Sequence, residues 1–509
     1  MTTTLASLTD LLTRQGMLDR GTDAATPVTG VSFDSRQVSP GDLFVCKGAA
    51  FRAGFLAIAM EAGAVGYLCD ETHADALAAA QPDVPALVAP DDQLRPAMAV
   101  AAAEAYDHPD HDLHVVGITG TKGKSTVAYM LRAILDAGEP YSRCAIMGSI
   151  DTFDGVERFE STNTTPEAPE VFRHLANARD AGLGYMVMEV SSQGLKYDRV
   201  RGVDLGIGVF LNIGRDHISA VEHPTFEDYF ASKLRIFEQS RVAVVNLATD
   251  HVEEVLNAAE RCERVVCFSA GGPAAVCGRT PDVWAENVTP SCGFVSFDAH
   301  TPSWEGHVIL GMGGLFNVEN ALAAIACCEV LGVGHEQIVD ALNVVKVPGR
   351  MELVESGDGR IVAIVDYAHN VLSFERLFDS LAAEYPGREV IAVFGAPGGK
   401  AQERRRQLPE TAARFCDHII YTEEDPAHED AAAICAEMLS NTPAGVEAEA
   451  VPDRAEAVRR AVDVARSSGR DCVVALLAKG DERLMHRGDA FEPCETDAEL
   501  VLKALRAAE

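Results

Sequence analysis

Short runs of apolar residues, each followed by polar residues, recur along the chain and alternate with stretches that have the apolar spacing of helices. Runs of this length predict buried strands. The strands are expected at 43–46, 66–69, 86–89, 113–118, 185–188, 208–211, 361–365, 390–394, 418–422 and 472–478. Helices are expected at 53–62, 97–106 and 127–135. Strands alternating with helices predict mostly parallel, doubly wound sheets, so the expected fold class is α/β.

The chain of 509 residues is too long for a single hydrophobic core and predicts about three domains. The grouping of the strands places these domains at 1–90, 91–347 and 348–509. A proline-rich piece at 82–96 predicts a linker ahead of the alanine-rich helix. Because ligands of such sheets bind beyond the carboxyl ends of the strands, the polar residues that follow the strands are the candidate site residues.

Composition and charge exclude several classes of partner. A hydrophobic content of 47% with 24% charged residues is typical of a globular protein. The net charge of −34 argues against nucleic acid or an anionic membrane as a partner, and it requires that any anion be held by a local cluster of cations. No apolar run approaches the length of a membrane helix, and the first twenty residues do not have the pattern of a signal peptide. We therefore expect no membrane insertion.

Thirteen cysteines are scattered singly, apart from the pair Cys327 and Cys328, and no Cys-x-x-Cys motif is present. This distribution predicts reduced thiols, neither a disulfide framework nor a zinc site, and it favours a cytoplasmic location.

A glycine-rich turn stands between the predicted strand 113–118 and the predicted helix 127–135. Its residues are Gly120, Thr121, Lys122, Gly123, Lys124, Ser125 and Thr126. Strand, turn and helix in this order predict a nucleotide phosphate site, with backbone N–H groups and Lys124 around the phosphates and the Ser125 hydroxyl available to Mg²⁺. The glycine spacing is unusual, because Gly117 precedes Gly123 by six positions where the common pattern has five. The alternative is an ordinary strand–turn–helix corner.

Polar residues follow two further strands of the central region. Glu189 comes directly after one strand, and His217 follows the next. Each alone is more often a structural cap, but two of them beside a phosphate turn favour Mg²⁺ coordination. Near the start of the chain, Asp34-Ser35-Arg36 predicts an Asx-turn, with a phosphate contact as the alternative.

Taken together, the motifs resemble those of the Mur ligases, the ATP-dependent amino-acid-adding enzymes of peptidoglycan synthesis. The motifs that carry the resemblance are Thr119-Gly120-Thr121-x-Gly123-Lys124-Ser125, Asn163-Thr164-Thr165-Pro166, Met188-Glu189-Val190-Ser191-Ser192, Asn212-x-x-x-Asp216-His217, Phe316-Asn317-x-x-Asn320, Gly349-Arg350-Met351-Glu352 and Asp366-Tyr367-Ala368-His369. They run from Asp34 to Gly480 in family order, so the resemblance covers nearly the whole chain. The subset is similar to the MurE type, which adds a diamino acid to UDP-N-acetylmuramoyl-L-alanyl-D-glutamate.

The resemblance implies a fold and a reaction. It implies an N-terminal uridine-nucleotide domain, a central P-loop ATPase and a C-terminal Rossmann-like domain. ATP phosphorylates the D-glutamyl γ-carboxylate, and the amine of the incoming amino acid then attacks the acyl phosphate. Such phosphoryl transfer needs cations and N–H donors more than a covalent nucleophile. The implied partners are small molecules, namely ATP, the UDP-muramoyl dipeptide and L-lysine, and we expect a monomer.

The resemblance also assigns roles to individual residues. Ser125, Glu189, His217 and Lys233 would hold Mg²⁺, with Lys233 carbamylated by CO₂, and Lys124 would contact the phosphates. Ser35, Thr164, Thr165, Ser191 and Arg199 would bind the muramoyl-peptide substrate. Asn317, Asn320 and Arg350 would lie on the adenosine side, and Asp366 and His369 would position the nucleotide. A solvated helix lysine is the alternative for Lys233.

The choice of amino acid depends on the loop Glu424-Asp425-Pro426-Ala427. Relatives that add meso-diaminopimelate carry an arginine at the position of Ala427, where a guanidinium can hold the second carboxylate. The carboxylates of Glu424 and Asp425 instead suit a side chain that ends in an ammonium group, so L-lysine is expected, with L-ornithine or meso-diaminopimelate as alternatives. Lys400 replaces an arginine of diaminopimelate-adding relatives, and Glu482 would bind the amino group of the amino acid.

Two rival functions remain at this point. The first is a ligase of the same fold similar to folylpolyglutamate synthase, and the second is a nucleotide-switch or binding protein. The Asp34-Ser35-Arg36 region argues against the former, and the absence of an Asn-Lys-x-Asp guanine motif argues against the latter.

Overall fold

The computed structural model describes residues 2–48, 51–161, 163–216, 218–219 and 222–507 of the chain. By its internal contacts the chain divides into two compact units. The first comprises 1–124, 138–245 and 249–266, and the second comprises 125–137, 246–248 and 267–509. The predicted boundaries near residues 90 and 347 stay a prediction.

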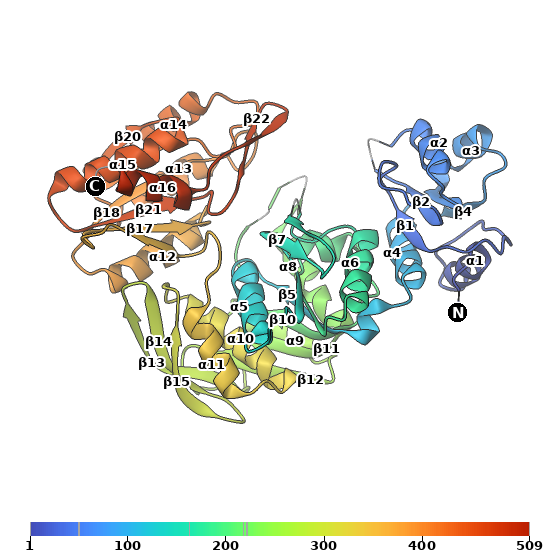
Figure 1. Cartoon of the computed structure of the whole chain (residues 1–509), viewed down its shortest axis with the longest axis horizontal. Helices are drawn as coiled ribbons and strands as arrows, with labels where there is room; N and C mark the ends of the chain where they lie inside the picture. Colours follow the sequence, from blue (N-terminus) through green and yellow to red (C-terminus); the bar gives the residue numbers. More distant parts are fainter. Residues whose placement is uncertain (1, 49–50, 162, 217, 220–221, 508–509) are drawn as a thin grey trace. The chain divides into compact units, whose positions relative to one another are not determined.

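The N-terminal part of the first unit is built on a four-stranded parallel sheet (Figure 1). Its strands, in spatial order, are β1 (Gly30–Ser32), β2 (Asp42–Cys46), β3 (Gly66–Asp70) and β4 (Ala86–Ala89). The helices of this part are α1 (Leu5–Arg14), α2 (Ala53–Glu61) and α3 (Glu71–Ala80). Phe44, Leu56, Tyr67 and Leu77 share its buried core, as the apolar runs predict.

The predicted linker at 82–96 is wrong in extent, because β4 lies within it and α4 (Leu94–Ala105) begins before it ends. Pro96 stands in the first turn of α4, where the missing N–H of proline removes no helical hydrogen bond. Proline here belongs to the start of a helix and not to a flexible segment.

The largest sheet has eleven strands in the order β15-β14-β13-β12-β11-β10-β5-β9-β6-β7-β8. The pairs of β5 with β9 and β10, of β6 with β9, and of β10 with β11 are parallel. The edges are antiparallel, because β13, β14 and β15 form one meander and β6, β7 and β8 form another. The bounds are β5 (His114–Thr119), β6 (Cys144–Met147), β7 (Asp151–Phe153), β8 (Arg158–Glu160), β9 (Tyr185–Glu189), β10 (Leu205–Phe210), β11 (Ser240–Asn246), β12 (Arg264–Ser269), β13 (Val283–Ser291), β14 (Phe294–His300) and β15 (Glu305–Leu310).

Helices follow most of the parallel strands of this sheet, as a doubly wound fold requires. They are η1 (Pro109–Asp112), α5 (Lys124–Asp136), α6 (Ala168–Asp180), α7 (Ser192–Lys196), α8 (Phe226–Leu234), η2 (Arg235–Gln239), α9 (Val252–Ala259), α10 (Asn317–Leu331) and α11 (His335–Val344).

The C-terminal part of the second unit contains a six-stranded sheet in the order β16-β17-β21-β18-β19-β20, of which only β16 is antiparallel to its neighbour. The strands are β16 (Glu352–Glu355), β17 (Ile361–Asp366), β18 (Glu389–Phe394), β19 (His418–Tyr421), β20 (Glu447–Ala450) and β21 (Cys472–Leu477). A separate hairpin is formed by β22 (Leu484–Arg487) and β23 (Ala490–Pro493). The helices are α12 (Val371–Glu384), α13 (Arg404–Ala412), α14 (Ala431–Ser440), α15 (Arg454–Ser468) and α16 (Asp497–Arg506).

The core of this part lies between the sheet and the neighbouring helices α15 and α16 (Figure 1). Val365, Val474 and Leu476 of the strands pack against Val458 and Val462 of α15. Every residue of β17 and of β21 is buried, and this explains why the sequences of these strands are nearly continuous apolar runs. The predicted α/β class with mostly parallel sheets is confirmed.

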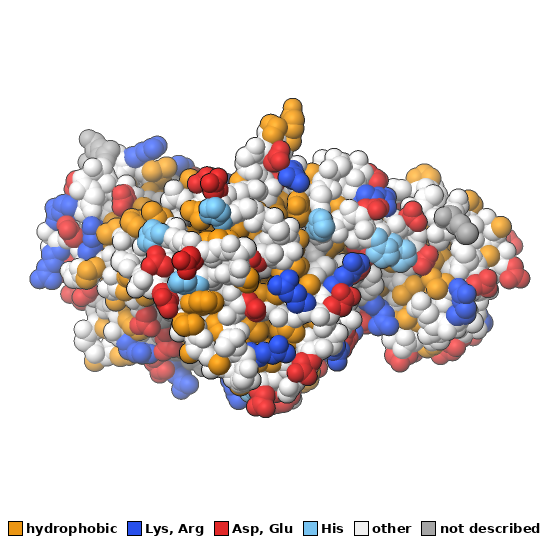
Figure 2. All heavy atoms as spheres, turned by 90° about the horizontal axis from the view of Figure 1, so that it is seen from below, with side chains coloured by type: hydrophobic (Ala, Val, Ile, Leu, Met, Phe, Trp, Pro, Cys, Tyr) orange, Lys and Arg blue, Asp and Glu red, His pale blue; other side chains and the backbone are white. Residues whose placement is uncertain are grey.

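On the face shown in Figure 2, acidic side chains are spread among basic ones and are not gathered in one area. All thirteen cysteines are free thiols. None of the helices within the described residues combines the length and the apolar composition needed to span a bilayer.

Candidate active site

The glycine-rich turn lies between β5 and α5, where the sequence predicts it. Gly123 has a φ of +91°, in the left-handed region that favours glycine. A Cβ atom at Gly120 would lie 2.9 Å from Leu211 Cβ, so this position also requires glycine. Lys124, the first residue of α5, donates from Nζ to the Gly120 carbonyl at 3.0 Å. Lys124 is thereby folded back over the turn, at the N-terminus of a helix whose dipole favours an anion.

Asn212 holds this turn to the end of β10. Its side-chain oxygen accepts from the Lys122 N–H at 2.9 Å, and its Nδ2 donates to the Lys122 carbonyl at 3.1 Å. The Lys122 ammonium lies 3.3 Å from Asp216. The turn is therefore fixed by the neighbouring strand exit, which pre-organises its N–H groups. Ser125 and Thr126 are buried in the first turn of α5.

Lys233 lies on α8 with only 2% of its surface exposed. Its Nζ donates to the Gly120 carbonyl at 2.8 Å, and it lies 4.8 Å from the centroid of the Tyr229 ring. Burial, together with the charges of Lys124 and Lys122, holds the pKa of Lys233 well below its usual value, although Asp216 opposes the shift. The predicted alternative of a solvated lysine is wrong, because the side chain is buried beside the turn.

Glu189 ends β9 and is paired with Ile118 of β5 in the sheet, so it lies beside the start of the turn. It is 2% exposed, and its Oε1 accepts from the Ser149 N–H at 2.7 Å. A Cβ atom at Gly148 would lie 2.4 Å from Oε1, which explains the glycine there. A buried carboxylate beside a phosphate turn is a suitable cation ligand. His217, the other predicted ligand, lies outside the described residues.

The residues expected to bind the muramoyl-peptide substrate are brought together by α7 and the segment before α6. Thr165 Oγ1 lies 3.1 Å from Ser191 Oγ and donates to the Glu189 carbonyl at 2.9 Å. Arg199 donates from Nη1 to the Thr165 carbonyl at 3.0 Å. Thr164 Oγ1 accepts from the Ser149 hydroxyl at 3.0 Å. All four are thus linked, through one network, to the residues around Glu189.

A cluster of ions adjoins these residues and is here called the Glu167 cluster; it consists of Glu167, Lys47, Arg95 and Arg199. The Glu167 carboxylate lies 3.0 Å from Arg95 Nη1, 3.3 Å from Lys47 Nζ and 3.3 Å from Arg199 Nε. Burial alone would raise the pKa of Glu167, but the three cations hold it below its usual value. Three cations around one carboxylate leave an excess of positive charge, which is the local basic site that the net charge of −34 requires.

Sequence reasoning missed Glu167, Lys47 and Arg95. Glu167 directly follows the motif that ends in Pro166, so its position was available as a signal, and Lys47 directly follows β2. Arg95 has no such signal, because only the fold brings α4 beside Glu167.

Ser35 is buried in the turn after β1, where the sequence places it. Beside it, Arg36 donates from its backbone N–H to Asp34 Oδ1 at 3.0 Å and from Nη2 to Oδ2 at 2.6 Å. The hydrogen bonds from Arg36 lower the pKa of Asp34, despite the opposing effect of burial. The structure therefore shows the predicted Asx-turn, with the guanidinium of Arg36 paired to Asp34.

In the second unit, Asn317 and Asn320 form a buried pair at the start of α10. Asn317 Nδ2 donates to the Gly313 carbonyl at 2.6 Å, and Asn320 Nδ2 donates to Asn317 Oδ1 at 2.8 Å. These bonds hold both amides in one orientation, which fits the predicted role of recognising a planar ligand.

Arg350, Asp366 and His369 lie around the end of β17. Asp366 accepts from the N–H groups of Met351 and Ala368 at 2.9 and 2.8 Å. His369 Nδ1 lies 2.6 Å from the carbonyl oxygen of Tyr367. The Arg350 guanidinium lies 4.6 Å from the centre of the Tyr367 ring. Asp366 thus fixes the backbone of the strand exit. The predicted roles, positioning of the nucleotide for Asp366 and His369 and an adenosine-side contact for Arg350, stay predictions.

The predicted amino-acid loop converges on a residue that the sequence did not single out as a ligand, Lys479. Its Nζ lies 3.0 Å from Asp425 Oδ1 and 2.6 Å from Glu482 Oε2, and we call these three residues the Lys479 cluster. Burial by itself would lower the pKa of Lys479, but the charges of Glu482 and Asp425 raise it. The Tyr367 hydroxyl donates to Glu482 Oε1 at 2.9 Å. Both oxygens of Glu482 are therefore oriented.

Glu424 stands beside this cluster with its carboxyl group buried. Its Oε2 has no hydrogen-bond partner among the described residues. Burial raises the pKa of Glu424 to about 8; the charges of Arg404 and Arg454 oppose this shift, and those of Asp425 and Glu482 add to it. The site thus holds a carboxyl group that an ammonium ligand would satisfy.

The backbone of this loop is held in an unusual conformation, since Asp425 and Ala427 both have positive φ, +44° and +49°. A Cβ atom at Gly398 would lie 1.8 Å from the Pro426 carbonyl oxygen, so the glycine-rich loop after β18 packs directly on the amino-acid loop. Ala427 donates from its N–H to the His486 carbonyl at 2.9 Å. Lys400 is exposed, and the structure places it directly after Gly399 at the end of that glycine-rich loop.

Comparison with known proteins identifies the family. Residues 118–328 match the Mur ligase middle domain, and residues 349–480 match the Mur ligase, glutamate ligase domain. A UDP-N-acetylmuramyl-tripeptide synthetase of Bifidobacterium longum (strain NCC 2705) is 35% identical over 523 residues, covering 98% of this chain and 99% of its own. The UDP-N-acetylmuramoyl-L-alanyl-D-glutamate--L-lysine ligase of Enterococcus faecalis (strain ATCC 700802 / V583) is 33% identical over 477 residues, covering 92% of this chain and 90% of its own.

A solved UDP-N-acetylmuramoyl-L-alanyl-D-glutamate--2,6-diaminopimelate ligase, 24% identical, covers 100% of this chain and 99% of its own at a TM-score of 0.65, and shares the fold. Both matching domain models describe Mur ligases, and the named relatives match this chain over nearly their whole length, so the family is assigned. The chain is a ligase and belongs to the Mur ligase family.

Proposed function

We propose that the protein adds L-lysine to the D-glutamyl γ-carboxylate of UDP-N-acetylmuramoyl-L-alanyl-D-glutamate in an ATP-dependent reaction of peptidoglycan precursor synthesis. The observation that carries the choice of lysine is the group of three carboxyl side chains, Glu424, Asp425 and Glu482, in the predicted amino-acid site. The names of relatives at 33–36% identity, which include L-lysine ligases of Enterococcus and Streptococcus, support it.

The first step uses groups around the glycine-rich turn. The N–H groups of Gly120 to Thr126 and the Lys124 ammonium are suited to orient the ATP phosphates and to balance charge as the γ-phosphoryl group moves to the substrate carboxylate. The excess positive charge of the Glu167 cluster, with Arg199, is suited to hold the anionic dipeptide in line.

Mg²⁺ fits the chemistry of the predicted ligands. Ser125 and Glu189 offer the hydroxyl and carboxylate oxygens that this ion prefers, and His217, which lies outside the described residues, is the further predicted ligand. When bound, Mg²⁺ would supply positive charge that offsets the charge of the phosphates.

Lys233 would complete this set as a carbamate. Burial lowers the pKa of the Lys233 amine. In its neutral form, R–NH₂, the amine can attack CO₂: an N–C bond forms, one C=O π bond of CO₂ opens, and one N–H proton is released, which gives the carbamate R–NH–COO⁻ and H⁺. A carbamate places anionic oxygens where an ammonium would repel a cation. CO₂-depleted buffer should therefore lower the activity of the natural protein, and bicarbonate should restore it, whereas Lys233→Ala should stay inactive in both. Equal activity of the natural protein in both buffers would contradict the carbamate.

The second step forms the amide bond. The amine nitrogen of lysine attacks the acyl carbon, the C–O bond to the phosphoryl group breaks, and inorganic phosphate and a proton leave. Glu482, the expected contact of the amino group, is oriented by Tyr367 and Lys479, and Asp425 and Glu424 face the remainder of the amino acid's charge.

The experiment that tests the proposal supplies ATP, Mg²⁺ and L-lysine with or without the UDP-muramoyl dipeptide, and it measures ADP release and the mass of the product. Release that requires the dipeptide, with a product heavier by one lysine residue, supports the function. Release that ignores the dipeptide overturns it and favours a nucleotide-switch or a folylpolyglutamate-synthase-like activity.

A further inference from the structure

Three side chains of metal-ligating type lie together just before β5, namely His108, Asp110 and His111. One ligand atom from each lies within 4.8 Å of the others. Asp110 and His111 belong to η1, and His108 is its N-cap. The six residues of β5 separate this cluster from the glycine-rich turn. Along an extended strand this is a distance of about 20 Å, so the cluster lies at the opposite end of β5. The cluster is therefore separate from the candidate active site.

Asp110 is the member that demands explanation. It is 2% exposed, and its Oδ2 accepts from the N–H of Asp204, next to the first residue of β10, at 2.7 Å. Its Oδ1 is buried and has no hydrogen-bond partner among the residues that the structure describes. Leaving a buried carboxylate oxygen unpaired is costly, and a bound cation removes that cost.

The two histidines are arranged around this carboxylate. Their rings are stacked, with centroids 5.1 Å apart and an angle of 10° between the planes. His111 Nε2 lies 4.0 Å from Asp110 Oδ2. His108 Nε2 lies 3.1 Å from Glu104 Oε1, so a carboxylate already orients this ring, as is common for histidines that bind metals.

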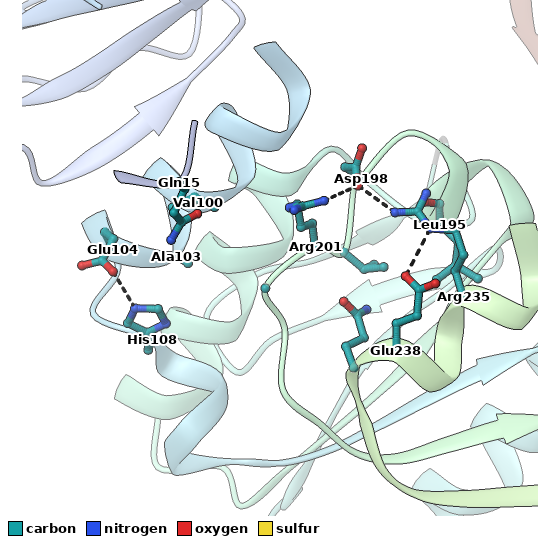
Figure 3. Close-up of a pocket in the computed structure, with 13 residues that line it drawn as sticks. Gln15, Val100, Ala103, Glu104, His108, Leu195, Asp198, Arg201, Arg235 and Glu238 are labelled. Atoms are coloured by element: carbon teal, nitrogen blue, oxygen red, sulfur yellow. Dashed lines mark hydrogen bonds and ion pairs between the residues drawn. The ribbon is translucent and has the colours of Figure 1, made fainter. Parts of the chain in front are cut away.

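The two histidines are open to solvent. His111 is exposed, and Glu104 and His108 line a pocket of about 430 Å³ that also includes Gln15, Arg201 and Arg235 (Figure 3). An ion could therefore approach the cluster from the side of the histidines, whereas the Asp110 carboxylate is buried.

A second cluster of similar composition, Asp154, Glu157 and His174, shows what a satisfied network looks like. Asp154 Oδ2 lies 2.6 Å from His174 Nδ1 and accepts from Asn177 at 2.8 Å, while its Oδ1 accepts from two backbone N–H groups. Every oxygen of Asp154 is used, and Glu157 accepts from Arg173 at 2.8 Å. Hydrogen bonding accounts for this cluster, whereas it leaves Asp110 Oδ1 unexplained.

We propose that His108, Asp110 and His111 bind one divalent transition-metal ion. Two imidazoles and one carboxylate match Zn²⁺ better than Mg²⁺, which prefers oxygen ligands only, and water would complete the coordination. Asp110 Oδ2 links η1 to the segment that enters β10, because it accepts from the N–H of Asp204. An ion bound to Asp110 would hold in place the carboxylate that makes this link.

The test is equilibrium dialysis of the full chain, with its thiols reduced, against Zn²⁺ in excess Mg²⁺. The variants are His111→Ala and Asp110→Asn, and the matched control is His307→Ala. The control histidine is 57% exposed, compared with 58% for His111, and lies 2.8 Å from Asp298. Zinc held by exposed thiols such as Cys277 is common to all variants and cancels in the comparison.

We expect the natural protein and His307→Ala to hold one Zn²⁺ more than His111→Ala and Asp110→Asn. Zinc should also raise the melting temperature of the first two by more than that of His111→Ala. Equal zinc content and equal melting shifts in all four proteins would overturn the site. Because His111 is exposed, its replacement should leave the fold intact, and a loss of zinc by that variant cannot be ascribed to unfolding if its circular dichroism matches that of the control.

Discussion

The Glu167 cluster and the Lys479 cluster are built from the same kinds of side chain in opposite proportion. In the first, Lys47, Arg95 and Arg199 surround a single carboxylate. In the second, a single lysine lies between Asp425 and Glu482. One leaves an excess of positive charge and the other an excess of negative charge, as expected for the binding of a phosphorylated acidic substrate and of a diamino acid.

This difference shows that the net charge of −34 predicts little about the individual sites. Within one Debye length, about 8–10 Å at physiological salt, the nearest ions determine which ligand is favoured. The bulk charge excludes polyanionic partners, while three neighbouring cations suffice to hold a small anion.

The largest expected effect is at the cation-rich cluster. Arg199→Ala removes a guanidinium that contacts both Thr165 and Glu167, and it should lower kcat/KM for the UDP-muramoyl dipeptide by roughly 100-fold, since losing one partner of a buried charged pair costs about 2–5 kcal/mol. Steady-state kinetics with varied dipeptide would measure it.

Arg459→Ala is the matched control for that variant, because Arg459 is paired with Glu456 outside the predicted sites and its side chain is 65% exposed. The control should stay within about twofold of the natural protein. Equal losses in the two variants would mean that the Glu167 cluster has no special role.

A smaller effect is expected at the acid-rich cluster. Glu482→Gln keeps the hydrogen bond from Tyr367 but removes the charge, and the loss of one charge-assisted hydrogen bond should raise KM for lysine by roughly 10- to 100-fold. The KM values for ATP and for the dipeptide should not change. If the rate of Glu482→Gln depends on lysine concentration in the same way as that of the natural protein, Glu482 does not belong to the amino-acid site.

The smallest effect concerns Glu424 and stability. Its pKa is about 8 in the folded chain and near 4.5 when unfolded, so between these values the folded chain holds a proton that the unfolded chain has lost. The contribution of this group to stability therefore falls as pH rises from 4.5 to 8. Glu424→Gln has no carboxyl group to ionise, so its stability does not show this decrease. The melting temperature of Glu424→Gln minus that of the natural protein should therefore be about 2–4 °C larger at pH 8 than at pH 5. A difference that is the same at both pH values would place Glu424 in a polar, solvated environment.

The sequence predicts those parallel strands that are continuous apolar runs buried along their length, such as β17 and β21. It does not predict the parallel strands β11, β12 and β20, which contain exposed residues. It does not predict the antiparallel strands β13 and β14, where buried and exposed residues alternate and long polar stretches intervene. The end of the predicted linker was wrong because Pro96 serves as a helix-start residue.

Among site residues, those within a local motif could be predicted, such as Lys124, Glu189 and Ser191. Residues recruited from a distance could not, since Arg95 lies 72 positions from Glu167 and Lys479 lies 54 positions from Asp425. Contacts of this kind depend on which elements the fold places side by side, and no local pattern records them.

The most direct test of the contrast between the two clusters is the ratio of kcat/KM values for L-lysine, L-ornithine and meso-diaminopimelate, measured with saturating ATP and UDP-muramoyl dipeptide. The acid-rich site, with Ala427 in place of an arginine, predicts the highest value for lysine and the lowest for diaminopimelate, whose second carboxylate would face Glu424 and Asp425. A value for diaminopimelate equal to or above that for lysine would contradict it.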